Sequence, residues 1–280
     1  MKAYPITVLC RVMEASRSGF YLYLKRYTCS RIDPEVYALE SEIKNLFIKH
    51  KQQYGSRRIM KELQKQGYQI GRYRVRSLMK KLGLKVKKRN RFQVTTDSKH
   101  SHQVAANLLD RKFDVKDPDR VWTTDITYIW TLTGWMYLAV VMDLYSRQIV
   151  GWAMDRRMKV ELTLDALAMA YFRRKPSAGL LHHSDRGSQY ACPRYQGQLN
   201  QYKMIPSMSR KANCWDNAPM ERFFRSLKSE RISNCRFNNR KQARAEILDY
   251  ISYYNADRLH SSLGYMSPME YEKEQLSLAA

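Results

Sequence analysis

Three strand patterns follow one another directly after residue 120, and they restrict the fold more than any other feature of the sequence. Residues 121–129, 135–143 and 148–154 are rich in β-branched and aromatic residues, and only short turns separate them. Strands joined by short turns pair with their neighbours in the antiparallel sense. The sequence therefore predicts a three-stranded antiparallel meander.

Helical and strand patterns alternate in the rest of the chain. The expected helices are 161–172, 193–202, 217 to beyond 230, and 241–254, and the expected strands are 179–183 and 205–209. The order of elements is thus β-β-β-α-β-α-β-α. It predicts an α/β fold in which a mixed five-stranded sheet carries helices on its faces.

The residues before 120 show helical patterns without strands. Short helices joined by glycine-containing turns, the last of them rich in Arg, predict a small all-α helix-turn-helix region, although small helical bundles share this pattern. Gly67 and Gly83 are expected to end the last two helices. The expected helices are 6–14, 18–26, 33–50, 56–66 and 72–82.

These patterns divide the chain into four parts. A short N-terminal helical segment (1–30) and a helix-turn-helix domain (31–90) come first. A polar and basic stretch with little periodicity (91–118) is expected to be a linker. The α/β core with a C-terminal helical extension follows at 119–280.

Positive charge is concentrated in the helical third. The chain has 50 Lys and Arg against 26 Asp and Glu, a net charge of +24, and residues 1–100 hold 24 of these basic and 7 of these acidic residues. Ten basic residues and no acidic one lie in 71–91, interleaved with apolar residues at helical spacing from Tyr73 to Leu82. One helix face is therefore expected to pack, Tyr73 included, while the other binds a polyanion. The candidate contacts are Arg57, Arg58, Arg72, Arg74, Arg76, Lys80 and Lys81.

Nucleic acid is the favoured partner, and an anionic membrane is the weaker alternative because the apolar helix face is committed to a core. The longest apolar run, 135–142, is far short of the roughly 18 residues that a membrane-spanning helix needs.

The five cysteines form no close CxxC pair, which argues against a disulfide framework and a structural zinc site. We expect a soluble intracellular protein.

Three acids occupy positions typical of catalytic carboxylates. Asp125 lies within the first strand, where a buried acid is costly unless it is paired or binds a cation. Asp185 follows the fourth strand in a glycine-containing loop, and Glu221 lies in the first turns of the helix that begins near residue 217. Converging carboxylates suit Mg²⁺, which prefers oxygen ligands. Arg225 and Lys228 follow Glu221 on the same helix face.

Other interpretations of these acids and their neighbours remain open. Asp143, Asp155 and Asp216 also lie near element ends, and any of the chosen acids could instead cap a helix or form a salt bridge. The pair His182-His183 suggests zinc, but adjacent strand residues point to opposite faces. Packing of the two rings is therefore the favoured interpretation.

Sequence motifs around the three acids resemble a known family. The segments 122–128 (WTTDITY), 183–190 (HSDRGSQY) and 216–224 (DNAPMERFF) closely resemble the integrase core of the DDE transposases of bacterial insertion sequences. Within that group the chain is similar to the second-frame (OrfB) transposases of the insertion-sequence-three family, which are related to retroviral integrases. Asp185 and Glu221 leave 35 residues between them, as in the family. Further motifs at 54–59, 73–79 and 254–268 extend the resemblance over nearly the whole chain.

The resemblance implies a ribonuclease-H-like integrase core that cleaves and joins DNA strands at the ends of a mobile element. Asp125, Asp185 and Glu221 would hold two Mg²⁺ ions, with Mn²⁺ as a substitute, and Lys228 would contact a DNA phosphate. The implied partners are the element's terminal inverted repeats, target DNA and further copies of the chain in a synaptic complex. The resemblance also implies a location in the bacterial cytoplasm, at the nucleoid through bound DNA.

The sequence departs from the family pattern at two points. Leu259 stands where the family often has Pro. The family's first-frame helix-turn-helix and leucine zipper, which recognise element ends, have no counterpart before Met1, so a separate or frameshift-fused first-frame (OrfA) partner is expected.

Two other classes of function compete with the transposase. A DNA-binding regulator with an inactive core would lack one of the three acids, whereas a nuclease for RNA/DNA hybrids would not need the first third of the chain, which contains the helix-turn-helix region.

Trp215, just before the Glu221 helix, is a candidate for stacking on an unpaired terminal base, and packing under its loop is an equal alternative.

Overall fold

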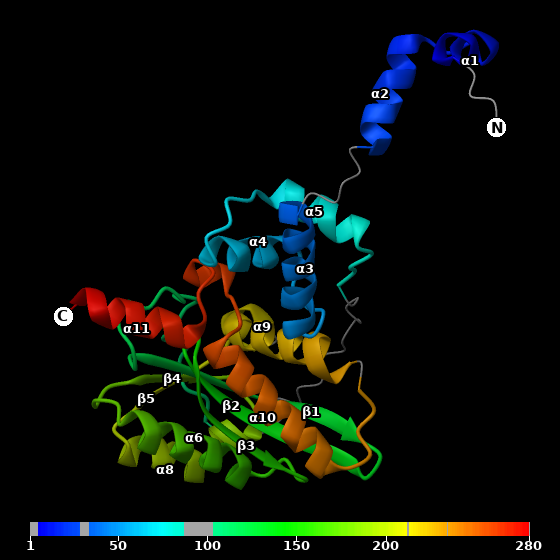
Figure 1. The fold of residues 1–280 in the computed structure, drawn as a ribbon. Coiled ribbons are helices and arrows are strands. Elements are labelled where there is room, and N and C mark those ends of the chain that lie inside the picture. Colours follow the sequence, from blue (N-terminus) through cyan, green and yellow to red (C-terminus); the bar gives the residue numbers. More distant parts are fainter. Residues whose placement is uncertain (1–4, 29–33, 87–102, 212, 234, 280) are drawn as a thin grey trace. The chain divides into compact units, whose positions relative to one another are not determined.

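A computed structural model of the chain describes residues 5–28, 34–86, 103–211, 213–233 and 235–279. The chain divides into two compact units, Met1–Lys87 and Lys88–Ala280 (Figure 1). Within the described ranges, no helix has both the length and the apolar character needed to cross a membrane.

The N-terminal unit contains helices alone in its described residues. α3 (Pro34–Lys49), α4 (Ser56–Lys65) and α5 (Arg72–Lys81) pack on one another, and α1 (Ile6–Val12) packs on α2 (Arg17–Thr28). Leu39, Ile43, Ile59, Leu63 and Val75 are among the buried residues of α3, α4 and α5. The sequence predicted these five helices within a few residues of their ends.

Glycine ends the helices of this unit as expected. Gly67 adopts a φ of +92°, and the next residue, Tyr68, donates its N–H to the carbonyl of Leu63 at 3.0 Å. Gly83 has a φ of +67° and ends α5 in the same way. One expectation was wrong: Tyr73 is 83% exposed instead of packed. It lies two residues before Val75, about 200° around the helix, and so on the face opposite the buried Val75 and Met79.

The second unit is built on a five-stranded sheet in the order β3-β2-β1-β4-β5. β1 pairs with β2, and β2 with β3, in the antiparallel sense, which confirms the meander. β4 adds to the other side of β1 in the parallel sense, and β5 pairs in parallel with β4. The strands are β1 (Val121–Thr131), β2 (Gly134–Asp143), β3 (Ile149–Asp155), β4 (Leu181–Ser184) and β5 (Ile205–Met208).

Helices cover both faces of this sheet (Figure 1). One face contacts α6, which in turn packs on α7 and α8, and the other face contacts α9 and α10. The α/β fold expected from the sequence is confirmed, and α7 and α11 are additional helices. The bounds are α6 (Val160–Arg174), α7 (Ser188–Ala191), α8 (Pro193–Gln201), α9 (Ala218–Leu227), α10 (Arg240–Ala256) and α11 (Pro268–Ala279).

Alternating side chains along the central strands divide the core into two layers. On β2, Leu138, Val140 and Met142 join the cluster under α9 and α10, whereas Ala139 and Val141 join the cluster under α6 and α8. This period of two explains why a nearly continuous apolar run forms a strand that is buried on both faces.

The segment before β1 contributes to this unit. Leu109 is 3% exposed, and the backbone N–H groups of Leu108 and Leu109 both donate to the hydroxyl of Ser207 on β5. Residues 103–118, the described part of the expected linker, therefore pack on the core. Residues 91–102 of that segment lie outside the described residues.

Candidate active site

The parallel pairing of β1 with β4 ends close to two of the three acids. The ladder pairs Val121 with Leu181 and Thr123 with His183. Asp125 lies two residues further along β1, and Asp185 is the first residue after β4, so both follow closely on the end of the β1–β4 ladder. The ladder therefore brings the strand position of Asp125 and the loop that carries Asp185 to the same end of the paired segment.

The loop after β4 fixes the Asp185 carboxylate. Its Oδ1 accepts the backbone N–H of Gly187 at 2.9 Å. A Cβ at position 187 would come within 3.0 Å of that oxygen, so a side chain there would crowd the carboxylate. The glycine of this loop is thus explained by the close approach of the acid to the backbone.

A pair of buried hydrogen bonds ties the start of α9 to the strand that carries Asp125. Asn217 accepts the hydroxyl of Thr123 through Oδ1 at 2.5 Å and donates through Nδ2 to the carbonyl of Thr124 at 3.1 Å. Glu221 lies one turn into this helix, and its side chain is partly buried. Asn217 was not among the site residues predicted from the sequence. Its position directly before the helix that carries Glu221 is the sequence feature that pointed to it.

The electrostatics indicate that the three acids converge. Burial raises the pKa of Asp125 well above its ordinary value, and the charges of Asp185 and Glu221 raise it further, while the backbone N–H of Ile126, at 2.7 Å from Oδ1, lowers it. Asp185 and Glu221 are therefore within electrostatic range of Asp125.

Lys228 lies beside this group at a change in helix geometry. α9 ends at Leu227, and a π-helical turn, η2 (Lys228–Ile232), continues it. The Lys228 ammonium is 4.7 Å from the centre of the Tyr128 ring. Burial lowers its pKa, whereas Tyr128 and Asp125 raise it. The lysine is therefore within electrostatic range of the acids and partly withdrawn from water.

The competing acids have structural partners. Asp216 is fully buried and accepts hydrogen bonds from Arg210, Arg111 and Asn107, and the Arg210 side chain holds its pKa well below the ordinary value. Asp143 is also fully buried; it accepts two backbone N–H groups and lies 3.4 Å from Arg174. Asp216 and Asp143 therefore stabilise loops.

The two histidines of β4 bind different neighbours. His183 bonds to Ser207 at 2.9 Å and Ser209 at 3.1 Å, while His182 bonds to the hydroxyl of Tyr195 at 3.2 Å. Burial lowers the pKa of His183 to about 4 and that of His182 to about 3, so both rings are neutral near pH 7. This arrangement supports packing and disfavours joint chelation of zinc.

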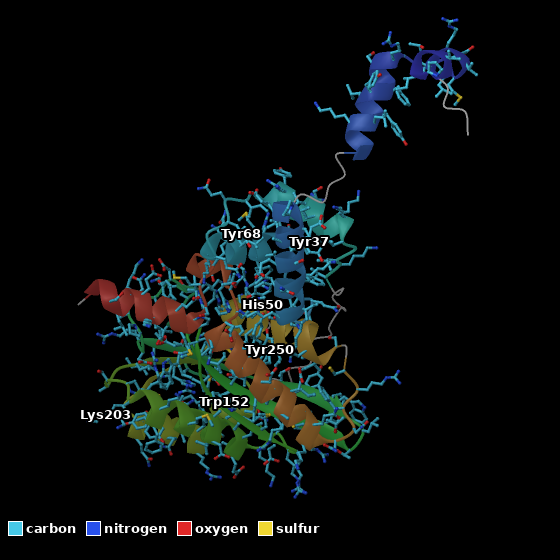
Figure 2. All side chains as sticks on the ribbon, in the orientation of Figure 1. Tyr37, His50, Tyr68, Trp152, Lys203 and Tyr250 are labelled. Atoms are coloured by element: carbon cyan, nitrogen blue, oxygen red, sulfur yellow. The ribbon has the colours of Figure 1, made fainter. Side chains whose placement is uncertain are left out.

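A buried ion pair supports the π-helical turn. Arg258 donates from Nε and Nη2 to the two oxygens of Glu230 at 2.8 and 2.6 Å. Tyr250 of α10, which is labelled in Figure 2, donates to the same carboxylate at 2.9 Å. Arg258 also donates to Ser226 on α9 at 3.0 Å. This network links the loop after α10 to the turn that carries Lys228.

The candidate DNA contacts are mostly exposed. Trp215 is 69% exposed in the short helix η1 (Cys214–Asn217), so the packing alternative was wrong, and Arg225 is exposed on α9.

The candidate contacts of the N-terminal unit differ in exposure. Arg58 is half-buried, with its guanidinium 5.1 Å from the centre of the Tyr54 ring. Lys81 forms an ion pair with Glu40 at 2.5 Å. The remaining candidates there are exposed: Arg57, Arg72, Arg74, Arg76 and Lys80.

The donor set at the acid site fits a hard divalent cation. Three carboxylates supply oxygen ligands, which Mg²⁺ prefers, and they come from two strands and a helix. In the described part of the chain, no three His, Cys, Asp or Glu side chains are grouped tightly enough to coordinate one ion. The three acids therefore influence one another's charge, but their side chains are not positioned to coordinate one ion together.

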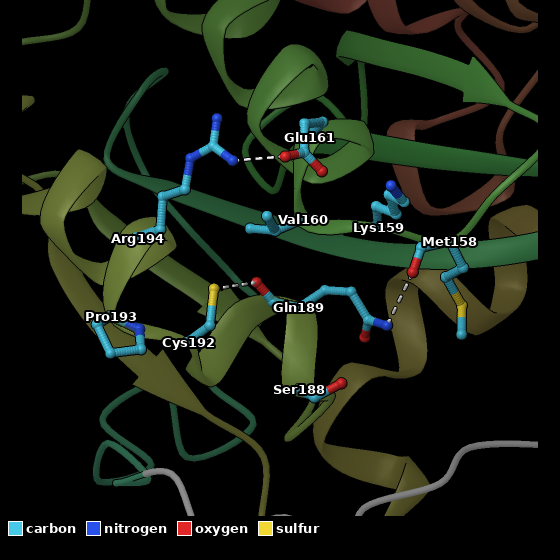
Figure 3. A pocket seen from close by; sticks show the side chains of 9 residues that line it. All are labelled: Met158, Lys159, Val160, Glu161, Ser188, Gln189, Cys192, Pro193 and Arg194. Carbon is cyan, nitrogen blue, oxygen red and sulfur yellow. Dashed lines mark hydrogen bonds and ion pairs between the residues drawn. The ribbon is translucent and has the colours of Figure 1, made fainter.

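A second hollow lies where the start of α6 faces α7 and α8, with a volume of about 590 Å³ (Figure 3). Arg194 and Glu161 form an ion pair at 2.5 Å on its wall, and Gln189 donates to the carbonyl of Met158 at 3.3 Å. None of the three acids lines it. Its lining residues lie on both sides of the Asp185 loop in sequence, and Arg194, Glu161 and Gln189 are already paired within it.

Comparison with known proteins identifies both units. Residues 115–214 and 221–276 match two models described as integrase core domains, and residues 35–92 match an HTH-like domain. The chain is 44% identical to the "Insertion element IS600 uncharacterized 31 kDa protein" of Shigella sonnei, covering 97% of this chain and 100% of that protein. It is 39% identical to "Transposase InsF for insertion sequence IS3A" of Escherichia coli K12, covering 98% and 96%.

Among solved structures, the catalytic core domain of BIV integrase is similar to this chain with a TM-score of 0.44 and 17% identity. The match covers 58% of this chain and 99% of that one.

Proposed function

Because the chain belongs to the IS3 family of insertion-sequence transposases, we propose that Asp125, Asp185 and Glu221 are its catalytic residues. The family membership makes the protein a DNA transposase, a polynucleotidyl transferase with an integrase core. The effect of the Asp185 and Glu221 charges on the pKa of Asp125, which places the three acids within electrostatic range, is the observation that supports this assignment.

The cofactor in this proposal is a pair of Mg²⁺ ions, for which Mn²⁺ can substitute. Asp125, Asp185 and Glu221 would hold them, and the bound pair would activate an attacking hydroxyl and stabilise the leaving 3′ oxygen of a phosphodiester. The protein itself contributes by positioning the three carboxylates. The β1–β4 ladder sets the two aspartates, and the hydrogen bonds of Asn217 set the helix that carries Glu221.

Three residues near the acids are proposed to hold DNA. Lys228 supplies a compact positive charge for a phosphate near the cleaved bond, and Arg225 supplies a second cation on the same helix. Trp215 offers an exposed aromatic face to an unpaired terminal base, a contact that contributes about 1–3 kcal/mol.

The N-terminal unit is proposed to provide a second DNA-binding surface. The exposed cations on α4 and α5 form its contact surface, chiefly Arg57, Arg72, Arg74, Arg76 and Lys80, with Arg58 and Lys81 at the margin. Its match to an HTH-like domain supports this role. The boundaries 31–90 for this domain and 119–280 for the catalytic core remain our assignment.

We propose terminal inverted repeats and target DNA as the substrates, because relatives are named as transposases of insertion sequences. Synapsis of two ends requires at least two copies of the chain in the working complex. A first-frame (OrfA) partner is included in the proposal as the component that recognises the ends.

The decisive experiment compares three neutralised variants with a matched control. Asp125→Asn, Asp185→Asn and Glu221→Gln should each reduce Mg²⁺-dependent cleavage and joining of repeat-ended DNA by about 10²–10³-fold, as expected for the loss of a group that stabilises developing charge. Asp155→Asn neutralises an exposed acid at the end of β3 and should leave activity unchanged.

Unchanged strand transfer in all three variants would eliminate the proposed centre. A purified protein that cuts RNA/DNA hybrids in these conditions without ever joining DNA ends would favour the nuclease alternative. The assay supplies the first-frame partner, so that failure to find the ends is not mistaken for an inactive core.

A further inference from the structure

A cavity of about 140 Å³ lies on the flank of α9, between that helix, the turn after β2 and the loop after α10. Arg147 and Arg222 both line it, together with His260, Ser226 and Ser262. Its apolar wall consists of Phe113, Met142, Ala218, Pro219 and Tyr254. It is roughly ten times larger than the space that one water requires, so it holds a group of several non-hydrogen atoms.

The Arg147 guanidinium is only partly satisfied in this cavity. Its Nη2 donates to the carbonyl of Phe113 at 2.8 Å, whereas its Nη1 is buried and has no hydrogen-bond partner. A buried donor without an acceptor is costly, and more so when it is charged. Burial lowers the pKa of Arg147, and the charge of Arg222 lowers it further, which indicates that two cations face each other here.

The nearest carboxylates are already paired with other cations. Asp114 lies 3.1 Å from the ammonium of Lys116, and Asp143 lies 3.4 Å from Arg174. Within the described residues, neither Arg147 nor Arg222 forms an ion pair with an acid. The cavity thus has an excess of positive charge and an unused donor.

We propose that this cavity binds a phosphate group. Two guanidinium groups match the geometry of phosphate oxygens, which accept paired N–H bonds. The Ser226 hydroxyl already accepts from Arg258 at 3.0 Å, so its own proton is available for an anion. The first turn of α9 lines the cavity and adds the favourable end of a helix dipole.

The position of the cavity indicates what the phosphate does. Arg222 directly follows Glu221 on α9, so a phosphate bound there would brace the flank of the helix that carries a proposed catalytic acid. Exposed Arg222 and Ser262 form its solvent side, so a phosphate can enter from solution or from a nucleic-acid strand.

The first test uses inorganic phosphate and does not depend on transposase activity. Thermal unfolding of the full chain is followed by tryptophan fluorescence in phosphate and in chloride at equal ionic strength. Phosphate at ten times its Kd should raise the Tm by about 3–6 °C above the chloride value. Arg147→Gln and Arg222→Gln should abolish this difference, and Lys241→Gln, which removes an exposed cation on α10, should keep it.

The inference is overturned if phosphate and chloride give the same Tm in the unmodified chain, or if both arginine variants keep the phosphate-specific shift. Should Arg147→Gln fail to fold, the exposed Arg222 decides the outcome, since its replacement removes no buried contact.

A second arm identifies the source of the phosphate. The affinity for a short DNA duplex is measured against salt concentration. If the phosphate belongs to DNA, Arg222→Gln should reduce the slope of log K against log salt by about 0.9 relative to Lys241→Gln. A loss of the inorganic-phosphate shift with an unchanged slope would assign the cavity to free phosphate or a mononucleotide. Both results support the site and differ only in its occupant.

Discussion

The two units of the chain use their arginines in opposite ways. In the N-terminal unit, Arg72, Arg74 and Arg76 project from α5 into solvent, whereas apolar residues such as Val75 form the packed face. In the second unit, Arg258 and Arg174 are withdrawn from water and bonded to carboxylates. The arginines of α5 are thus exposed, whereas Arg258 and Arg174 support the fold of the second unit.

This difference follows from how each unit is stabilised. Short helices need only one apolar stripe to pack, so their remaining surface can carry many like charges. A sheet covered on both faces has loops that are partly buried, and their polar groups must be satisfied within the protein. Arg174, which binds Asp119 and Glu272, and Arg258 meet this requirement. The comparison predicts that replacing arginines has very different consequences in the two units.

The largest expected effect on stability is at Arg258. Arg258→Ala leaves the buried Glu230 without its cation and should lower the free energy of unfolding by about 3–5 kcal/mol. Arg72→Ala, at an exposed position on α5, should change it by less than about 0.5 kcal/mol. Urea unfolding measures both, with far-UV circular dichroism for the N-terminal unit. Equal losses in the two variants would break the comparison.

Each unit contains a buried group whose titration changes its stability, and these two groups, His50 and Asp143, act in opposite directions. Burial lowers the pKa of His50 in the N-terminal unit to about 4, so stability that is present above pH 6.5 is lost as the pH falls through 4 (Figure 2). Burial raises the pKa of Asp143 in the second unit to about 7, so stability that is present below pH 4 is lost as the pH rises through 7. Each of these changes in the free energy of unfolding is of the order of 3 kcal/mol.

Tryptophan fluorescence separates these responses, because all five tryptophans lie in the second unit. Hydrogen exchange in α3, α4 and α5 reports the N-terminal unit. His182 and His183, whose pKa values burial lowers to about 3 and about 4, give the second unit stability that is lost as the pH falls below 6.5, which opposes the effect of Asp143. Asp143→Asn should therefore make stability rise more steeply with pH between 4 and 7 in the fluorescence signal alone, and His50→Gln should flatten the pH dependence between 6.5 and 4 in the exchange signal alone. A variant that changes both signals would contradict the assignment of each group to its own unit.

Close packing in the second unit gives a smaller expected effect. A Cβ on Gly151 of β3 would lie 2.3 Å from the carbonyl oxygen of Ala166 on α6. Gly151→Ala should therefore destabilise the unit by about 1–3 kcal/mol in urea unfolding. Gly197→Ala is the matched control, since nothing lies within 4 Å of its Cβ on α8 and the change should stabilise by up to about 1 kcal/mol. Similar losses for both would refute close packing as the cause.

Replacing the exposed arginines of α5 is expected to have the smallest effect on stability. It should have a clear effect on DNA binding. Replacing Arg72, Arg74 and Arg76 with Gln should leave the Tm unchanged. The slope of log K against log salt for duplex DNA should fall by about 0.9 for each residue that contacts a phosphate. Isothermal binding measurements at several salt concentrations provide the slope. An unchanged slope with an intact fold would move the DNA surface away from this helix.

Local sequence patterns were sufficient for the elements of both units. The meander after residue 120, the glycine-terminated helices and the alternation of helices and strands can be read from short windows, because each depends on neighbouring residues. Tyr73 was misplaced because it was assigned to the apolar face of Val75 and Met79, although it lies about 200° from Val75 around the helix.

The sequence by itself determined which residue types were available: an aspartate within a strand, an aspartate in the loop after another strand, a glutamate early in a helix, and a surplus of cations in the first 100 residues. Only the tertiary structure decided which acids lie near one another. The β1–β4 ladder ends just before Asp125 and Asp185, whereas Asp216 is held by arginines, one of them from a distant segment. It also brought Arg147 and Arg222 to one cavity. Contacts between residues that are far apart in sequence depend on how complete elements pack, and no short window of sequence contains that information.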